Sequence, residues 1–200
     1  MITIINYGAG NLRSVVNAIM KLGFQPKVTN LVSDVLNAKL IILPGVGAAG
    51  DTMENLKKLD LIGPIRQYIA GGRPFLGICI GLQVLFTHTE EGGGDDCLNI
   101  IPGQVRRLPE GQKVPQIGWN QVKYKTANPI FKGIPDGTNF YFVHSYYADP
   151  EDKSLIIGET EYGIPFCSAV ARGNLVAVQF HPEKSGDNGL KVYENFIKQA

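Results

Sequence analysis

The residues with the clearest capacity for chemistry surround Cys79, in the segment PFLGICIGLQVLF at positions 74–86. An apolar, strand-like run precedes Cys79 and a helix-like run follows it, with glycines at 77 and 81. In a nucleophile elbow, a sharp turn from strand to helix brings these two flanking positions together, and glycine removes the clash. The pattern predicts a cysteine nucleophile in a strained backbone conformation at the carboxyl edge of a sheet.

The expected position of Cys79 also favours its reactive form. A cysteine at a helix N-terminus lies near free N–H groups and the positive end of the helix dipole, which stabilise a thiolate. The alternative is a buried structural cysteine in a tight turn. Cys97 and Cys167 lack the glycine-flanked setting and are interpreted as structural. With three cysteines in all and no C-x-x-C pair, neither a disulfide framework nor a zinc site is expected.

A thiol nucleophile needs a base, and the chain has three histidines. His88 falls near the end of the helix expected after the elbow, and His144 lies inside a predicted strand. His181 comes just past a strand end, so it can meet Cys79 at the same sheet edge. Glu183 is two residues further on and can hold the other ring nitrogen. A solvated turn is the alternative for this HPE string.

The turn LPGVGAAG at 43–50 is a candidate for an oxyanion hole. The first donor of such a hole is the N–H of the residue after the nucleophile, here Ile80. Glycines at 45 and 47 let a peptide turn a second N–H inward without steric cost. The alternative is an ordinary turn from a strand to a helix.

The elements that must position these residues change character along the chain. The first half alternates strands, predicted at 1–6, 25–30, 39–44 and 73–78, with helices, predicted at 11–22, 33–38 (Ser33 as cap), 51–58, 61–70 and 80–88. The second half is strand-rich, with strands at 103–108, 118–124, 138–148, 153–162, 165–173 and 174–180 and a helix at 189–200. Residues 90–97, EEGGGDDC, read as a mobile surface loop. We expect one α/β domain over residues 1–200, a three-layer sandwich with a mixed, largely parallel central sheet.

The composition excludes several classes of partner. Lys plus Arg is 19 and Asp plus Glu is 18, a formal balance of +1, which favours neither nucleic acid nor an anionic membrane. No apolar run reaches the roughly 18 residues of a membrane span, and the first residues do not read as a signal peptide. We expect a cytoplasmic protein. The sequence has no Walker-type phosphate loop.

Three motifs in this order, PGVG, GICIGLQ and FHPEKS, resemble the class I (triad-type) glutamine amidotransferases over essentially the whole chain. NYGAGNLRSV, PQIGWNQV and YFVHSYYA are similar to the glutaminase subunits of imidazole glycerol phosphate synthases within that class. The resemblance implies a flavodoxin-like sheet. Ile80 and Leu82 replace the leucine and methionine that are commoner there, and both changes conserve apolar volume.

The resemblance also implies roles for individual residues. Cys79 attacks the side-chain amide of L-glutamine and forms a γ-glutamyl thioester, His181 moves the protons, and Glu183 orients His181. The products are glutamate and ammonia, and no cofactor or metal is needed. Val46 and Ile80 supply oxyanion N–H groups, while Gly47, Gln83, Ser145 and Tyr146 line the glutamine pocket.

The ammonia must reach an acceptor on another protein. The resemblance implies a (β/α)₈-barrel cyclase subunit that receives ammonia through an internal channel. This partner makes imidazole glycerol phosphate and aminoimidazole carboxamide ribotide in histidine biosynthesis. Asn11, Trp119, Asn120 and Lys184 match stretches placed at that interface. Alternatively, Trp119 is a core residue and Lys184 a solvated side chain.

Three other functions remain open at this point. The chain can be a glutaminase subunit that serves a different acceptor synthase, a stand-alone γ-glutamyl hydrolase, or a regulatory binding module without catalysis. The family is described as nearly silent until the cyclase is loaded. A flip of the peptide at 45–46 would remove or supply an oxyanion donor and so provide a physical route to that silence.

Overall fold

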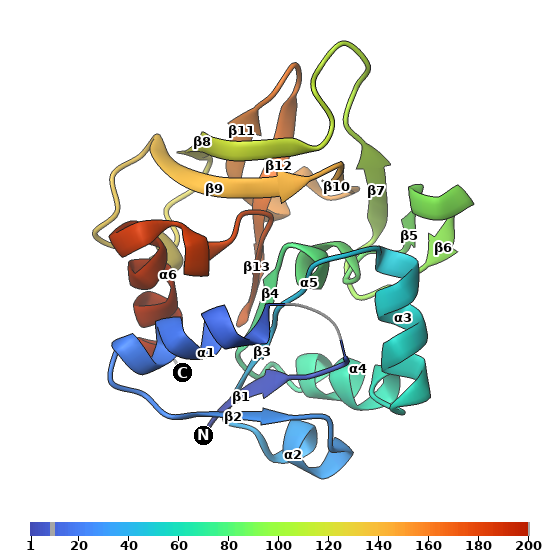
Figure 1. Ribbon diagram of the computed structural model, residues 1–200, viewed down its shortest axis with the longest axis vertical. Coiled ribbons are helices and arrows are strands. Elements are labelled where there is room, and N and C mark those ends of the chain that lie inside the picture. The colour runs from blue at the N-terminus through green and yellow to red at the C-terminus, as the bar shows by residue number, and fades with distance from the viewer. Residues whose placement is uncertain (9–10, 200) are drawn as a thin grey trace.

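The computed structural model describes residues 1–8 and 11–199 (Figure 1). A parallel unit forms one half of the main sheet, in the order β2 (Pro26–Thr29), β1 (Ile2–Ile5), β3 (Leu40–Leu43), β4 (Phe75–Ile78) and β13 (Leu175–Val178). Every residue of β1, β3, β4 and β13 is buried. Strands covered on both faces are nearly all apolar, which explains the apolar runs of the sequence; Thr3 of β1 is the one polar residue in these four strands.

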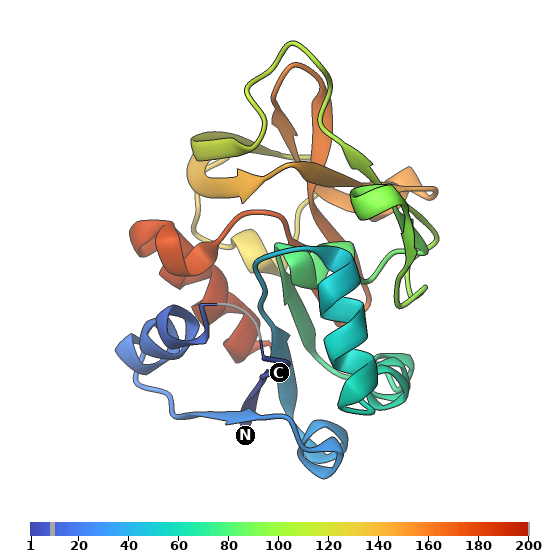
Figure 2. The same cartoon turned by 45° about the vertical axis from the view of Figure 1, so that its right-hand side comes forward.

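Helices cover both faces of this parallel unit, which confirms the three-layer prediction (Figures 1 and 2). One face carries α1 (Leu12–Lys21) and α6 (Gly186–Lys198), and the other carries α2 (Val32–Asn37), α3 (Ala49–Lys58) and α4 (Ile62–Ala70). Two separate apolar clusters result: Val15 and Phe196 belong to the first, and Leu56 and Tyr68 to the second.

The other half is mainly antiparallel and lies above the parallel unit in Figure 1. From β13 the main sheet continues through β12 (Pro165–Arg172), β10 (Tyr146–Pro150), β7 (Gly103–Arg107), β5 (His88–Thr89) and β6 (Asp95–Asp96). A branch leaves β12 through β11 (Ile156–Glu161), β8 (Gln116–Tyr124) and β9 (Thr138–His144). Short 3₁₀ turns lie at η1 (Glu91–Gly93), η2 (Pro129–Phe131), η3 (Lys153–Leu155) and η4 (Pro182–Lys184).

The helix predicted at 80–88 is wrong in its length. The helix after the elbow, α5, spans only Ile80–Gln83, and His88 lies in strand β5. The carbonyl groups of Val84, Leu85 and Phe86 accept N–H groups from residues 98–101 instead of continuing a helical ladder. A distant segment therefore ends the helix, and local sequence carries no sign of it.

Three further predictions need correction. The strand predicted at 138–148 is two strands, β9 and β10, because β9 pairs with β8 while β10 pairs with β7. Ser33 lies inside α2 rather than at its cap, where Leu31 stands. Residues 90–97 contain η1 and β6, and Glu91 Oε2 accepts the N–H of Ala49 at 2.7 Å, so this segment is tied to α3 rather than a free loop.

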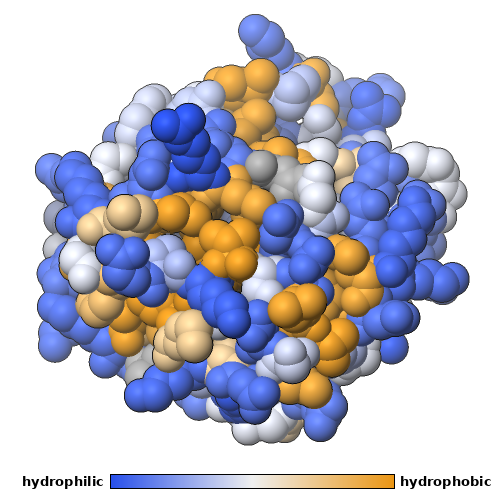
Figure 3. All heavy atoms as spheres, turned by 60° about the horizontal axis from the view of Figure 1, so that its bottom comes forward, coloured by the Kyte–Doolittle hydropathy of each residue, from blue (hydrophilic) through white to orange (hydrophobic). Residues whose placement is uncertain are grey.

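The face that carries the N-terminus shows hydrophobic patches broken up by hydrophilic atoms (Figure 3). Met1, Met20, Val28 and Leu31 are exposed large apolar residues. None of the helices in the described part of the chain is long and apolar enough to cross a membrane.

Candidate active site

Cys79 stands at the turn between β4 and α5 with φ 54° and ψ −106°, a left-handed conformation that L residues rarely adopt. A Cβ atom added to Gly77 would lie 2.5 Å from the carbonyl oxygen of Gly81. One added to Gly81 would lie 1.9 Å from the carbonyl oxygen of Leu43 in β3. Both glycines are therefore required. The first permits the turn itself, and the second permits its packing on the neighbouring strand.

The environment of the thiol differs from the sequence expectation in one respect. Because α5 has four residues, its macrodipole is small and contributes little. The N–H of Ile80, the first helical residue, still has no partner within the helix and is available to a ligand. The Cys79 side chain is 4% exposed, and its Sγ lies 3.9 Å from the carbonyl oxygen of Val143.

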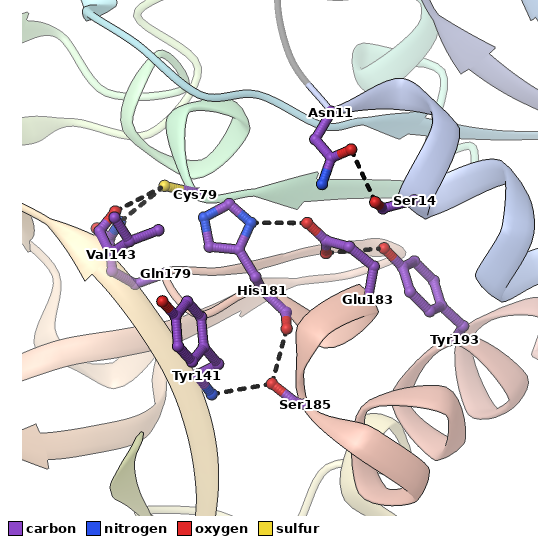
Figure 4. A network of polar contacts seen from close by, with 10 residues as sticks. All are labelled: Asn11, Ser14, Cys79, Tyr141, Val143, Gln179, His181, Glu183, Ser185 and Tyr193. Atoms are coloured by element: carbon purple, nitrogen blue, oxygen red, sulfur yellow. Dashed lines mark hydrogen bonds and ion pairs between the residues drawn. The ribbon is translucent and has the colours of Figure 1, made fainter. Parts of the chain in front are cut away.

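His181 and Glu183 form a buried pair at the end of β13. Nδ1 of His181 lies 2.8 Å from Glu183 Oε1, and both side chains are almost fully buried. The other ring nitrogen, Nε2, is buried without a hydrogen-bond partner among the described residues. It points toward the sulfur of Cys79 in Figure 4. Burial favours neutral His181, but Cys79 and Glu183 outweigh it and raise the pKa of His181 to about 10.

Several contacts fix this pair in place. The hydroxyl of Tyr193 on α6 donates to Glu183 Oε2 at 3.3 Å. The N–H of His181 donates to the carbonyl oxygen of Tyr141 on β9 at 2.9 Å. Ser185 Oγ accepts the N–H of Tyr141 at 2.9 Å and donates to the carbonyl oxygen of His181 at 2.7 Å (Figure 4). The imidazole is thus held by β13, β9 and α6 at once.

The other histidines do not take this position. His88 pairs with Asp96 through Nδ1 at 3.2 Å in the short β5–β6 ladder. His144 is buried, with Nδ1 2.8 Å from the carbonyl oxygen of Tyr146 and Nε2 2.8 Å from Gln116 Oε1. Burial lowers the pKa of His144 to about 4, so this ring is neutral at physiological pH.

A pocket of about 290 Å³ opens over Cys79. Val46, Gly47, Ile80, Gln83, Ser145 and Tyr146, the residues expected at the oxyanion hole and the glutamine pocket, all line it. Its wall also includes Glu91, Val143, His144 and Lys184. One side of the pocket comes from the parallel half of the molecule and the other from the antiparallel half.

The model of the family "Glutamine amidotransferase class-I" matches residues 3–200. The chain is 54% identical to "Imidazole glycerol phosphate synthase subunit HisH" of Dehalococcoides mccartyi, over 100% of this chain and 98% of that protein. The protein of the same name in Moorella thermoacetica is 51% identical, over 98% of this chain and 93% of that protein. This chain belongs to the class-I glutamine amidotransferases, in the HisH subunit family.

Solved structures support the fold of this amidotransferase. "Structure of PurLQS from Thermotoga maritima" superposes with a TM-score of 0.79 at 18% identity, covering 99% of this chain and 97% of that one. A "Crystal structure of glutamine amidotransferase" gives a TM-score of 0.77 at 17% identity, covering 98% of this chain and 97% of that one. The α/β sandwich with its mixed sheet is therefore the fold of class I glutamine amidotransferases.

Sequence reasoning missed two residues of the amidotransferase site. Glu91 lies in the segment interpreted as a mobile loop, yet it is the carboxylate of the pocket wall. Gln179, two residues before His181, is fully buried and donates through Nε2 to Cys79 Sγ at 3.6 Å. Its place just past the end of β13, beside the HPE string, is the signal that could have drawn attention to it.

The residues expected at a partner interface lie at several places on the amidotransferase. Trp119 on β8 is 57% exposed, so the alternative of a core residue is wrong. Lys184 is an exposed residue whose Nζ lies 5.5 Å from the ring centre of Tyr141. Asn120 donates to the carbonyl oxygen of Glu161 at 2.9 Å, and Asn11 accepts from Ser14 Oγ at 2.7 Å. Their role at an interface stays a prediction.

The described residues also bear on metal binding. Within positions 1–8 and 11–199, no three His, Cys, Asp or Glu side chains gather closely enough to hold a metal ion. The three cysteines are free and buried.

Proposed function

We propose that this chain is the glutaminase subunit of an imidazole glycerol phosphate synthase. It hydrolyses L-glutamine to glutamate and ammonia and delivers the ammonia to a cyclase subunit. The observation that carries the proposal is the alignment at the elbow. The Cys79 sulfur stands at the floor of a pocket, the unpartnered Nε2 of His181 points toward it, and Glu183 holds the opposite ring nitrogen.

The proposed hydrolysis of glutamine depends on proton transfer by His181. The raised pKa of His181 favours an imidazolium, which suits this residue to act as the first proton donor, and the proposed nucleophile is the thiolate form of Cys79. The thiolate attacks the carboxamide carbon of glutamine, and the imidazolium gives its proton to the departing nitrogen, which leaves as ammonia. A γ-glutamyl thioester remains on Cys79. Neutral His181 then removes a proton from water, the resulting hydroxide attacks the thioester, and glutamate and the thiolate separate.

Each tetrahedral intermediate carries an oxyanion that needs donors. The N–H of Ile80 and that of Val46 are the proposed pair, and both residues line the pocket beside Cys79. Removing one such donor typically costs about 10²–10³ in rate. Gly47 has φ +100°, so the Val46 turn depends on a conformation that favours glycine.

The pocket wall supplies complementary groups for the amino-acid end of glutamine. Ser145 and Tyr146 approach from the antiparallel half, and Gln83 from the turn of α5. Glu91 is the proposed partner of the substrate's α-ammonium group, because a cation in a partly buried pocket needs an anionic partner. Lys184, also in the wall, offers the opposite charge to the α-carboxylate.

The chain supplies ammonia and, on this proposal, its partner supplies the acceptor. The relatives from D. mccartyi and M. thermoacetica are named as subunits of a synthase. We assign the partner as a (β/α)₈-barrel cyclase acting with this chain in the cytoplasm. Trp119, Asn120, Asn11 and Lys184 are the interface candidates, and the exposed indole of Trp119 suits an anchoring role.

The decisive variant is Cys79→Ala, studied together with the cyclase. We expect glutamine-dependent product formation to disappear, while added ammonium salts still support product formation by the partner. Glutamine-dependent turnover that survives in Cys79→Ala would refute the nucleophile assignment. Loss of the ammonia-dependent reaction as well would show that the variant had damaged the complex rather than the chemistry.

A second measurement separates this function from a stand-alone γ-glutamyl hydrolase. Glutaminase rates are compared for the isolated chain, for the chain with the cyclase, and for the complex with the acceptor nucleotide. We expect the rate to rise at each step, because a peptide flip at 45–46 in the loaded complex would supply the second oxyanion donor. Equal rates in the three conditions would rule out coupling and favour a hydrolase.

A further inference from the structure

A chain of buried amides ends on the nucleophile. Nε2 of Gln179 donates to Cys79 Sγ at 3.6 Å, and Oε1 of Gln179 accepts from Gln83 Nε2 at 3.1 Å. Gln83 Nε2 also donates to the carbonyl oxygen of Tyr146 at 2.8 Å. These contacts connect β10, which forms one wall of the pocket, to the reactive sulfur through two side-chain amides.

The orientation of both amides follows from their neighbours. The oxygen and nitrogen of an amide can exchange places by a half-turn, so only the partners decide between them. The carbonyl of Tyr146 can only accept, so the Gln83 nitrogen must face it. The same nitrogen has a second N–H, which requires an oxygen from Gln179. The NH₂ group of Gln179 is then left facing the sulfur of Cys79.

The backbone makes this placement rigid. Gln179 follows Val178 and Cys79 follows Ile78, and these two strand residues are partners in the parallel β4–β13 ladder. The N–H of Cys79 donates to the carbonyl oxygen of Val178, and the N–H of Gln179 to that of Ser168, both at 2.8 Å. The side chain of Gln179 is wholly inaccessible to solvent, so water does not compete for its N–H groups.

We propose that Gln179 is a catalytic hydrogen-bond donor to the Cys79 thiolate, and that Gln83 and the Tyr146 carbonyl hold its amide in the donating orientation. A hydrogen bond to an ionised acceptor is stronger than one to a neutral acceptor. The N–H of Gln179 therefore favours the thiolate over both the neutral thiol and the thioester. It assists formation of the nucleophile and later the departure of the sulfur when the thioester is hydrolysed.

On this assignment, His181 and Gln179 have different roles beside Cys79. His181 exchanges protons with the substrate and cannot serve as a permanent donor, since its Nε2 loses its proton to ammonia. The amide of Gln179 does not titrate, so it remains a donor through both halves of the reaction. The inference rests on the proposed function for its place in turnover, but its effect on the sulfur does not require that function.

The test is the pH dependence of Cys79 alkylation by iodoacetamide, followed on the Cys79 peptide by mass spectrometry. The thiolate displaces iodide, forming the S–C bond as the C–I bond breaks. In Gln179→Met the side chain keeps its length and loses the donor. We expect the midpoint of the alkylation profile to move up by about one pH unit, and the rate below the midpoint to fall about tenfold.

Two further variants calibrate that result. Gln83→Met leaves Gln179 in place but frees its oxygen, and should give a smaller shift in the same direction. Asn195→Leu removes a buried amide on α6 that donates to Ile130 and Lys132 carbonyls, 2.9 and 2.8 Å away, and should leave the profile unchanged. A wild-type profile in Gln179→Met overturns the proposal. If that variant does not fold, a wild-type profile in Gln83→Met overturns it.

Glutaminase assays on the same variants keep the two proposals apart. A shifted alkylation profile in a chain that never hydrolyses glutamine, even with the cyclase and its ligand, leaves the donor assignment standing and defeats the proposed function. If the alkylation profile of Gln179→Met is unshifted while the chain hydrolyses glutamine, the proposed function stands and the donor assignment is refuted. With both proposals correct, Gln179→Met lowers kcat, and its kcat recovers toward the wild-type value as pH rises.

Discussion

The two halves of this amidotransferase contribute to the pocket in different ways. The parallel half presents Cys79 from a turn where the backbone of β3, β4 and α5 is in close contact and side chains are excluded. The antiparallel half presents His144, Ser145 and Tyr146 from strands whose side chains pack on one another. Cys79 is therefore placed by backbone sterics, and the facing wall by side-chain packing and hydrogen bonds. Substitutions in the two halves should differ accordingly.

The largest expected contrast compares one glycine from each half. In Gly81→Ala the new Cβ meets the Leu43 carbonyl oxygen at 1.9 Å, whereas in Gly158→Ala it meets a Val122 methyl at 2.9 Å. A backbone atom cannot move aside as a side chain can. We expect Gly81→Ala to lose more than about 4 kcal/mol of stability or fail to fold, and Gly158→Ala to lose about 1–3 kcal/mol.

Urea unfolding of the two glycine variants measures this contrast. Equal losses would show that the elbow yields as readily as the antiparallel half, and the distinction between backbone and side-chain placement would then be lost.

The next effect tests the buried histidine of the antiparallel half. Burial lowers the pKa of His144 from 6.5 to about 4, so the unfolded chain binds this proton more readily than the folded one. The contribution of His144 to stability is therefore complete above pH 6.5 and is lost as pH falls toward 4. The loss is about 3 kcal/mol.

This prediction is checked by unfolding the wild type and His144→Gln across that pH range. The wild type should lose stability more steeply toward acid than the variant. If the stability of the wild type and of His144→Gln changed with pH in the same way, His144 would not be buried in a neutral form. The pocket wall around His144 would then be more accessible to water than its packing suggests.

A smaller effect concerns the charge that the segment 90–97 adds to the pocket. Glu91→Gln keeps the size of the side chain and removes its charge, so the ammonium group of glutamine loses its ionic partner. We expect KM for glutamine to rise about tenfold with a smaller change in kcat, the loss of one charged hydrogen bond. Asp96→Asn in the same segment, whose carboxylate contacts His88 and does not line the pocket as far as the described residues show, should not alter KM. Steady-state kinetics with equal KM values in all three proteins would remove Glu91 from substrate binding.

The smallest effect compares two buried tyrosine hydroxyls. Tyr193 donates to Glu183, while Tyr68 in the parallel half donates to the carbonyls of Lys39 and Pro74, 3.0 and 3.1 Å away. Each change to Phe should cost about 1–2 kcal/mol of stability, because a buried acceptor loses its donor. Only Tyr193→Phe should lower kcat, by a few-fold, since it alone loosens the carboxylate behind His181. A matching fall in kcat for Tyr68→Phe would assign both effects to stability.

The sequence predicted those features that depend on a local pattern of residues. The apolar runs at 39–44 and 73–78 marked interior strands, and the flanking glycines marked the turn at Cys79, because a tight turn and a doubly covered strand each restrict the residues within them. These patterns predicted the three-layer fold, and the structure confirmed it. The assignment of His181 and Glu183 as partners of Cys79 rested on strand ends meeting at one edge, and their catalytic roles stay predictions.

The features that were missed depend on distant parts of the chain. The end of α5 is decided by N–H groups from residues 98–101, and the break at Ser145 by the different partners of β9 and β10. Gln179 and Glu91 read as ordinary polar residues until folding brings them to the sulfur and to the end of α3. A single sequence does not show such contacts, because the partner of each group lies between 13 and 100 residues away.

The hydrogen bonds between His181, Ser185 and Tyr141 carry a mechanical consequence. The proposed general base, His181, is fastened by its main chain to β9, while the proposed nucleophile, Cys79, directly follows β4. A slide of β9 against β4 would therefore change the gap between the imidazole and the sulfur. Since the rate of proton transfer depends steeply on that gap, we expect the proposed reaction to require that these contacts stay rigid.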